Sequence, residues 1–175
     1  VTHLEALSGM TNLTELRLDI GDTVTTLDPL KELTQLKSLN LENYNSSNYY
    51  SLTDISALAG MTELTELYLT VGDVKDLSPL ANLTELKTLN LRGNFAADNL
   101  DFVREMTELR ELRVSPYSNG TIRVDDLSAL TNLTELQTLD LQLDGLKSLH
   151  GLENLTELRE LNLNGSEASL TDVDP

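Results

Sequence analysis

The 175-residue chain contains no cysteine, and aromatic residues make up only 4% of it. Without cysteine the protein has no disulfide bond, no thiolate ligand for a metal and no cysteine nucleophile. The scarcity of aromatic rings leaves leucine as the residue that carries the core.

Basic residues and long apolar runs are also scarce. Lys and Arg number 12 against 29 acidic residues, which gives a formal net charge of −17. DNA and RNA are therefore not expected as partners, because phosphate binding requires clustered basic residues. No apolar run approaches the length of a membrane span, so membrane insertion is not expected either. The acidity is typical of a surface that keeps a protein soluble and suppresses end-to-end association, and attraction of a basic partner is the alternative interpretation.

One leucine-spaced unit recurs seven times along the chain. Clear copies are Leu83–Leu91 (LTELKTLNL) and Leu133–Leu141 (LTELQTLDL), and the copies start near residues 10, 33, 61, 83, 106, 133 and 155. A unit near 22 residues that is occasionally stretched is the sequence signature of a solenoid. We therefore expect one domain over residues 1–175, with partial repeats at both ends.

Each unit predicts one strand and one short return segment. In the pattern Leu-x-Leu the leucines point into the core and the intervening residues face outward. The predicted strands are Glu15–Asp19, Ser38–Glu42, Glu66–Thr70, Thr88–Arg92, Glu111–Ser115, Thr138–Gln142 and Glu160–Asn164. A second apolar set, as in Leu77-Ser-Pro-Leu80, predicts brief helical or 3₁₀ returns, and Pro29 and Pro79 suit their first turns. One unit cannot bury enough apolar surface to fold alone, so neighbouring units must stack and pair their strands into one parallel sheet.

The repeated segments resemble those of a known family. Leu77–Leu86 (LSPLANLTEL) and Ile55–Leu64 (ISALAGMTEL) are similar to the repeats of bacterial internalins, within the larger class of leucine-rich repeat proteins. The resemblance implies an α/β solenoid: a right-handed leucine-rich repeat horseshoe with a parallel β-sheet on the concave face and short 3₁₀ or turn segments on the convex face. The family places Asn three residues after the last strand leucine, and only Asn94 keeps that pattern here, so we expect less uniform turns.

The two ends of the chain both fall within a repeat. Val1–Gly9 aligns with Val74–Asn82, and Ser169–Val173 aligns with Ser51–Ile55. Because solenoids need covered ends, we expect the chain to be an ordered piece of a longer protein. The alternative is end-to-end self-association, in which two copies cover each other's ends.

The outward positions of the predicted strands form columns across the inner face. The first column is Glu15, Ser38, Glu66, Thr88, Glu111, Thr138 and Glu160, and the second is Arg17, Asn40, Tyr68, Asn90, Arg113, Asp140 and Asn162. The first column alternates Glu with Ser or Thr. This regularity indicates duplication of a two-unit block and not selection for a ligand.

The aromatic residues gather in the connections that follow strands. Two stretched connections, Glu42–Ser51 and Ser115–Val124, are rich in Tyr, Asn, Ser and Gly, the residues that adaptable binding loops use. We predict a binding patch along one rim of the sheet. Its residues are Tyr44, Tyr49, Tyr50, Tyr68, Arg92, Arg113 and Tyr117. The competing interpretation is that these tyrosines only pack over the edge of the core. Phe95 and Phe102 are expected to replace the usual apolar residues of a return segment.

Catalytic and metal-binding patterns are missing from the sequence. His3 and His150 lie near opposite ends of the predicted stack, and neither has neighbours in a triad or zinc arrangement. The paired aspartates do not match an EF-hand loop. We therefore expect no cofactor, no metal and no enzymatic activity.

The resemblance and the tyrosine-rich connections favour a protein-binding module for ligand recognition or adhesion. The resemblance further implies a bacterial secreted or cell-surface protein. Two alternatives stay open: a structural spacer within a larger surface protein, and an intracellular regulatory scaffold.

Overall fold

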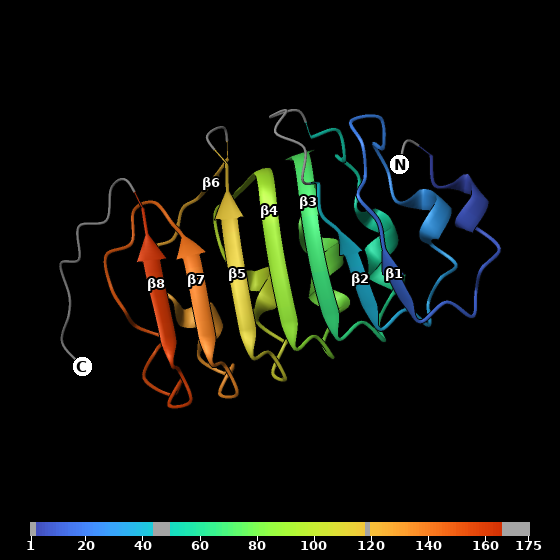
Figure 1. The fold of residues 1–175 in the computed structure, drawn as a ribbon. Helices are drawn as coiled ribbons and strands as arrows, with labels where there is room; N and C mark the ends of the chain where they lie inside the picture. Colours follow the sequence, from blue (N-terminus) through green and yellow to red (C-terminus); the bar gives the residue numbers. More distant parts are fainter. Residues whose placement is uncertain (1–2, 44–49, 118–119, 166–175) are drawn as a thin grey trace.

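The structure, a computed structural model, describes residues 3–43, 50–117 and 120–165. Its main feature is a parallel β-sheet whose strands follow one another in the order β1-β2-β3-β4-β5-β7-β8, while β6 pairs only with β4 (Figure 1). The strands are β1 (Glu15–Arg17), β2 (Ser38–Leu41), β3 (Glu66–Val74), β4 (Thr88–Ala97), β5 (Glu111–Pro116), β6 (Thr121–Ile122), β7 (Thr138–Gln142) and β8 (Glu160–Asn164). All seven predicted strands are present and begin at the predicted residues.

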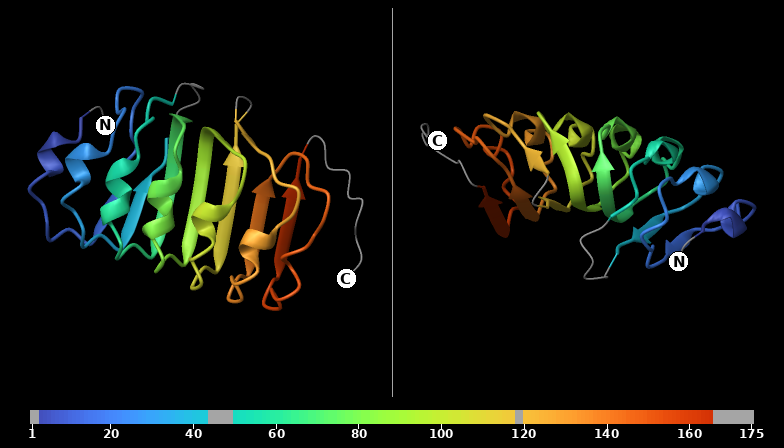
Figure 2. Two further views of the ribbon diagram at one scale, coloured as in Figure 1. Left: turned by 180° about the vertical axis from the view of Figure 1, so that it is seen from behind. Right: turned by 90° about the horizontal axis from the view of Figure 1, so that it is seen from above.

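Short 3₁₀ segments form the other side of the stack. They are η1 (Glu5–Leu7), η2 (Asp28–Leu30), η3 (Ser56–Gly60), η4 (Ser78–Asn82), η5 (Asp101–Val103) and η6 (Ser128–Leu130). Figure 2 shows the strands on the inner side of a curved stack and the 3₁₀ segments on the outer side. This arrangement confirms the predicted solenoid, with its sheet on the concave face. The return at Leu149–Leu152 forms a turn in which Gly151 has φ +106°.

The register of the sheet aligns equivalent residues of successive repeats. Glu66 of β3 is paired with Thr88 of β4, which is paired with Glu111 of β5, and the same register holds from β1 to β8. The predicted columns are therefore correct. Leu39, Leu67 and Leu89 are fully buried between their neighbours, as the strand pattern predicts.

Repeats in the first and last described positions are less well covered. Met10 and Leu161 are 49% and 50% exposed, whereas their counterparts Leu33 and Leu139 are fully buried. Among the described residues, each of these two repeats has a neighbouring repeat on one side only. Burial of the repeated leucine thus depends on stacking, as expected if one repeat cannot bury enough apolar surface to fold alone.

Strands β3 and β4 extend several residues beyond their predicted ends. The extended parts of β3 and β4 pair with each other at Val71–Gly93 and Val74–Phe95, and the segments that follow the stretched connections add further pairing. The Gly72 N–H donates to the Leu52 carbonyl at 2.6 Å, and Ala96 and Ala97 of β4 pair with β6. The Leu-x-Leu pattern contains no sign of this extension, because it depends on a connection that folds back beside the strand.

A side-chain oxygen precedes and caps each return segment from η2 to η6, and also the turn at Leu149–Leu152. The oxygen accepts the backbone N–H of the residue two positions later, at 2.8–3.1 Å. The pairs are Thr26–Asp28, Asp54–Ser56, Asp76–Ser78, Asn99–Asp101, Asp126–Ser128 and Ser148–His150. At Asp126 the Ser128 backbone N–H, followed by the Ser128 side chain, lowers the pKa of the carboxyl group below its ordinary value of 3.8. The fold therefore favours the ionised form of this aspartate.

We expect Gly93→Ala to destabilise the protein strongly. Gly93 has φ +131°, and a Cβ there would overlap the Val71 backbone of β3. The positive φ alone should reduce the free energy of unfolding by about 1–3 kcal/mol, to which the overlap adds. Gly9→Ala is the control, since nothing lies within 4 Å of a Cβ at Gly9. Thermal unfolding monitored by circular dichroism measures both. Equal melting temperatures for the two variants would contradict the prediction.

We expect Asp126→Ala to lower the free energy of unfolding at neutral pH by about 1 kcal/mol, the typical value of a lost cap. Asp126→Asn keeps an acceptor oxygen and should lose less. Because the pKa of Asp126 is lowered in the folded state, its pH-dependent contribution is present above the ordinary value of 3.8. That contribution disappears as the pH falls through the folded-state pKa. Urea unfolding at several pH values should therefore show the difference between wild type and Asp126→Ala narrowing below pH 3.8. A difference that does not change with pH would refute this assignment.

Candidate binding surface

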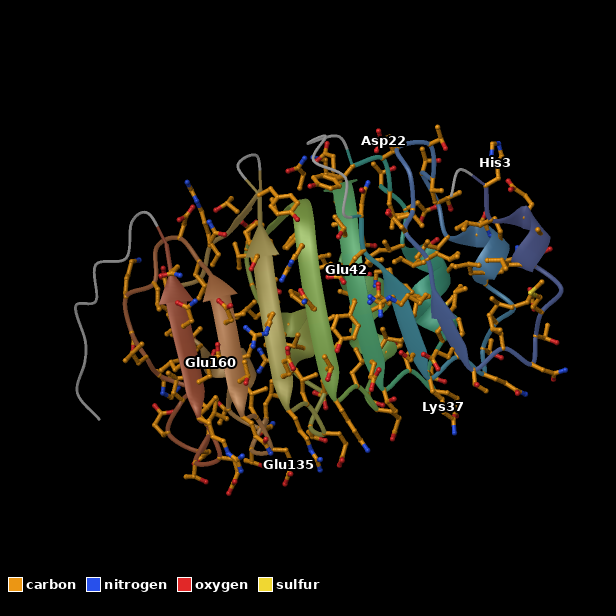
Figure 3. All side chains as sticks on the ribbon, in the orientation of Figure 1. His3, Asp22, Lys37, Glu42, Glu135 and Glu160 are labelled. Atoms are coloured by element: carbon orange, nitrogen blue, oxygen red, sulfur yellow. The ribbon has the colours of Figure 1, made fainter. Side chains whose placement is uncertain are left out.

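The concave face carries the side chains that differ most between repeats. Leucines of the strands point into the core, so only the alternate residues reach this face. Figure 3 shows that polar and charged side chains cover it from Glu42 across to Glu160. Any specific recognition by the sheet must use these alternate residues and the connections at its rim.

Two of the predicted tyrosines form a pair at the rim. The ring centroids of Tyr50 and Tyr117 are 5.1 Å apart, with an interplanar angle of 33°. They come from different connections, one preceding β3 and the other following β5, and both side chains are half-buried. The structure thus brings together residues that are 67 positions apart in the chain, from 50 to 117.

Glycines allow the two connections to approach the strand ends. The Tyr117 N–H donates to the Gly93 carbonyl of β4 at 2.7 Å, and a Cβ at Gly72 of β3 would overlap the Tyr50 backbone. Phe95 lies beneath this region and is 1% exposed. Both Phe95 and Phe102 are core residues. Phe102 lies in the return segment η5 as predicted, but the prediction was wrong for Phe95, which belongs to the extended strand β4. The tyrosine pair rests on a packed base and keeps part of its surface in solvent.

The Tyr117 phenol is held in its neutral form. Burial is the main cause that raises its pKa, followed by the neighbouring Tyr50 side chain, while the positive charge of Arg92 acts in the opposite direction. A neutral phenol both donates and accepts hydrogen bonds. Arg92 is exposed on β4, so its guanidinium is available beside the ring pair.

Tyr68 is the only aromatic residue of the second column, and it lies half-buried on β3. Its pKa is raised first by burial and then by the negative charges of Glu111, Glu66 and Glu42. A hydrogen bond with Thr88 of β4 acts in the opposite direction, so the phenol reaches from β3 across to the neighbouring strand. Tyr68 therefore sits among carboxylates at the centre of the concave face.

Arg113 lies at the centre of a charge cluster on β5. Its Nε donates to Glu111 at 2.8 Å, Nη1 to Asp140 at 3.3 Å and Nη2 to Glu160 at 3.2 Å. The hydrogen bond with Glu111 is the main cause that raises the Arg113 pKa above its ordinary value. The guanidinium thus connects β5 with β7 and β8. Its three carboxylate partners belong to the protein itself, which makes it less accessible to a partner than Arg92.

Asn90 was in the predicted second column but not among the predicted binding residues. It is paired in register with Tyr68 on one side and Arg113 on the other, and it is 7% exposed. Its Oδ1 has no hydrogen-bond partner among the residues that the structure describes. Sequence reasoning missed it because Asn is an ordinary residue for an exposed position, and its burial comes from the neighbouring strands.

Five of the seven predicted binding residues lie among the described residues, and they occupy two different places. Tyr44 and Tyr49 lie outside the described residues. Tyr50 and Tyr117 meet at the rim, with Arg92 beside them. Tyr68 and Arg113 lie on the concave face, two strands apart.

Metal-binding clusters and membrane-spanning helices are both absent from the described residues. Within residues 3–43, 50–117 and 120–165, no three His, Cys, Asp or Glu side chains are placed so that they form a metal site. No helix in the same ranges is both long and apolar enough to cross a membrane.

No family model matches the sequence, and no curated protein sequence matches it. Among solved structures, an internalin (InlF) from Listeria monocytogenes is 26% identical with a TM-score of 0.59, over 97% of this chain and 53% of its own. Internalin C2 of the same organism is 22% identical with a TM-score of 0.56, over 94% of this chain and 77% of its own. The leucine-rich repeat ectodomain of the plant receptor kinase GASSHO1/SCHENGEN3 from Arabidopsis thaliana is 20% identical with a TM-score of 0.68, over 94% of this chain and 19% of its own.

The protein is therefore a leucine-rich repeat solenoid. Its repeats are of the internalin-like class, which confirms the resemblance noted in the sequence. The chain spans about half the length of the InlF structure and about a fifth of the plant ectodomain.

We expect Arg113→Met to destabilise the protein more than Arg104→Met. Arg113 is 27% exposed and contacts three carboxylates, whereas Arg104 is 46% exposed and forms its ion pair with Asp101 alone. Removal of Arg113 should lower the free energy of unfolding by about 1 kcal/mol, against a few tenths for an exposed pair. Urea unfolding at low and at high salt measures both. A loss at Arg113 that is no larger than the loss at Arg104 would show that the cluster does not stabilise the sheet.

Proposed function

We propose that this chain is a protein-binding module that captures its partner on the concave face and the adjacent rim of β3, β4 and β5. The contact residues are Tyr50, Tyr68, Arg92 and Tyr117, called here the tyrosine surface. The observation that carries the proposal is the Tyr50–Tyr117 pair, held 5.1 Å apart and partly exposed. The predicted residues Tyr44 and Tyr49 belong to the same proposal, although they lie outside the described residues.

The chemistry of the tyrosine surface suits protein recognition. Tyrosine supplies a large contact area with few rotatable bonds, and tyrosine and arginine are enriched among the residues that contribute most to protein interfaces. Arg92 is exposed beside the rings, which gives it the freedom to pair with a carboxylate of the partner. Arg113, tethered by its own carboxylates, is a residue that orients neighbouring side chains in this proposal.

Several structural neighbours were solved with partners bound. GASSHO1/SCHENGEN3 is in complex with CASPARIAN STRIP INTEGRITY FACTOR 2, and the receptor kinase HAESA is in complex with the peptide hormone IDA and the co-receptor SERK1. These complexes support a binding role for the present solenoid, since the scaffold is the same. They do not identify the partner, because function in this fold depends on the individual surface residues.

For the setting of the protein we propose a secreted or surface-exposed bacterial protein. The support is the similarity to the two internalins from Listeria monocytogenes. Detection of the full-length protein on intact cells by antibody labelling, with sensitivity to added protease, tests this assignment. Labelling that requires permeabilised cells would favour the intracellular scaffold instead.

We expect Tyr50→Ala/Tyr68→Ala/Tyr117→Ala to lose at least about tenfold in affinity for a captured partner, because aromatic anchors contribute 1–2 kcal/mol or more each. The partner is selected from a displayed library of extracellular protein domains, and binding is measured by surface plasmon resonance. Hydrogen exchange of the complex should show protection at the ends of β3 and β4. The matched control is Arg104→Ala, which removes an exposed cation from the convex face.

The triple variant must also be tested for stability, because the two rim rings pack on each other. An aromatic pair contributes about 0.5–1.5 kcal/mol beyond its buried area, so a modest decrease in melting temperature is expected. Undiminished binding by a destabilised triple variant would favour the packing interpretation of the tyrosines. If the three substitutions leave the activity of the full-length parent protein unchanged, the structural spacer would be favoured.

A further inference from the structure

Asn90 presents a buried acceptor to the concave face. Its neighbours on β4, Leu89 and Leu91, are fully buried in the core, so by strand alternation the Asn90 side chain points to the opposite face. The residue is 7% exposed and its Oδ1 has no hydrogen-bond partner among residues 3–43, 50–117 and 120–165. A buried carbonyl oxygen without a donor is unfavourable, and such atoms in folded proteins call for an explanation.

Asn90 is flanked by Tyr68 and Arg113, and two carboxylates lie two positions away on the same face. Glu66 on β3 and Glu111 on β5 stand on either side of Thr88, two positions before Asn90 in the register. Glu66 accepts a hydrogen bond from the Ser38 hydroxyl of β2 at 3.0 Å, and Glu111 accepts one from Arg113 at 2.8 Å. The negative charges of both carboxylates act on the phenol of Tyr68, which is paired in register with Asn90, and these four residues are called here the Tyr68–Asn90 subsite.

The electrostatic balance of the Tyr68–Asn90 subsite favours a cation. The positive charge next to it is Arg113, whose three donor positions are engaged by Glu111, Asp140 and Glu160. One guanidinium faces three carboxylates there, and Glu66 adds a further negative charge on β3. A donor that also carries positive charge would satisfy the Asn90 oxygen and reduce the repulsion among the carboxylates.

We propose that the Tyr68–Asn90 subsite binds the primary ammonium group of a lysine side chain presented by the protein partner. This inference rests on the proposed function and names the chemistry that one part of the surface recognises. An ammonium group is compact and has three donors, which match the Asn90 oxygen and the carboxylates of Glu66 and Glu111. The Tyr68 ring adds a cation–π contact. A guanidinium is planar and wider, and Arg113 already occupies the neighbouring position with that shape.

Entry of the lysine requires movement of a side chain and not of the backbone. Tyr68 is half-buried and belongs to a surface column, so its ring changes rotamer without disturbing the leucine core. Glu66, Thr88 and Glu111 begin β3, β4 and β5, whereas Tyr50 and Tyr117 lie towards the opposite ends of these strands, next to Gly72 and Gly93. A partner that covers Tyr50 and Tyr117 and continues along the concave face towards the strand starts would bring a lysine to Asn90.

The test uses the peptide acetyl-Gly-Gly-Lys-Gly-Gly-amide, with norleucine and arginine versions as probes of charge and shape. Nuclear magnetic resonance of the ¹⁵N-labelled protein follows the Asn90 side-chain amide during titration. We expect a saturable shift with the lysine peptide, a weaker one with the arginine peptide and none with the norleucine peptide. Equal shifts with lysine and norleucine, or tighter binding of arginine, would overturn the proposal.

Matched variants separate the subsite from the general acidity of the protein. Glu66→Gln should weaken lysine-peptide binding about fivefold or more, as expected for a lost charge-assisted contact. Glu63→Gln changes the net charge equally at an exposed position outside the inner columns and should weaken binding less than about twofold. Equal effects of the two variants would show that the peptide responds only to the acidic surface.

Asn90→Leu distinguishes a binding role of Asn90 from a purely structural role, because the two roles predict different changes in melting temperature and in lysine-peptide binding. Loss of the unpartnered oxygen should raise the melting temperature, because the unfavourable burial disappears. The same variant should lose the lysine-dependent binding. A variant that is less stable, or that binds the lysine peptide normally, would contradict the assignment.

The outcomes also distinguish this inference from the proposed function. A selected partner that needs Tyr50 and Tyr117 but ignores Glu66→Gln and Asn90→Leu would support the binding module and refute the lysine subsite. Lysine-peptide binding that disappears in Asn90→Leu, in a protein that captures no partner domain, would support the subsite and refute the wider proposal.

Discussion

Burial of leucine between successive repeats is the interaction on which the rest of the structure depends. Each strand leucine is covered by the equivalent leucines of the strands on both sides, so a repeat becomes stable only within the stack. The end repeats illustrate this dependence, because Met10 and Leu161 remain about half exposed where one neighbour is absent from the described stack. The same stacking fixes the parallel register, and the register fixes which outward residues become neighbours.

Because of this register, only the outward-facing strand residues and the connections at the rim are available for recognition. Strands lie roughly 4.8 Å apart, so residues of one column form a continuous line across the sheet. The first column alternates Glu with Ser or Thr, whereas the second column has Tyr68, Asn90 and Arg113 at β3, β4 and β5. The rim is also irregular at these strands. Gly72 leaves room for the Tyr50 backbone, and Gly120 lets the connection that carries Tyr117 approach the Phe95 backbone. The two irregular regions therefore adjoin each other.

The acidity of the chain acts differently in different places. On the convex side, aspartates such as Asp126 cap the return segments, and their ionised form contributes to stability. On the concave face, Arg113 is surrounded by carboxylates, while the buried Asn90 oxygen has no donor within the part of the chain that the structure describes. A protein selected only for stability would have little reason to keep that oxygen, because a leucine of similar volume would avoid its burial. Local instability of this kind is what a binding site requires when the ligand supplies the missing donor.

The sequence by itself determined the solenoid, the starts of the seven strands that form the main sheet and the columns of the inner face, because Leu-x-Leu spacing and the repeat length follow directly from side-chain alternation and stacking. It also indicated that Phe102 replaces a core residue of a return segment, but it did not reveal β6 or the place of Phe95 in β4. Only the tertiary structure decided which tyrosines meet: the Tyr50–Tyr117 contact depends on two connections folding over glycines that the repeat pattern does not distinguish. Likewise, the burial of Asn90 and the tethering of Arg113 arise from side chains on neighbouring strands, and no local pattern along the chain encodes those distances.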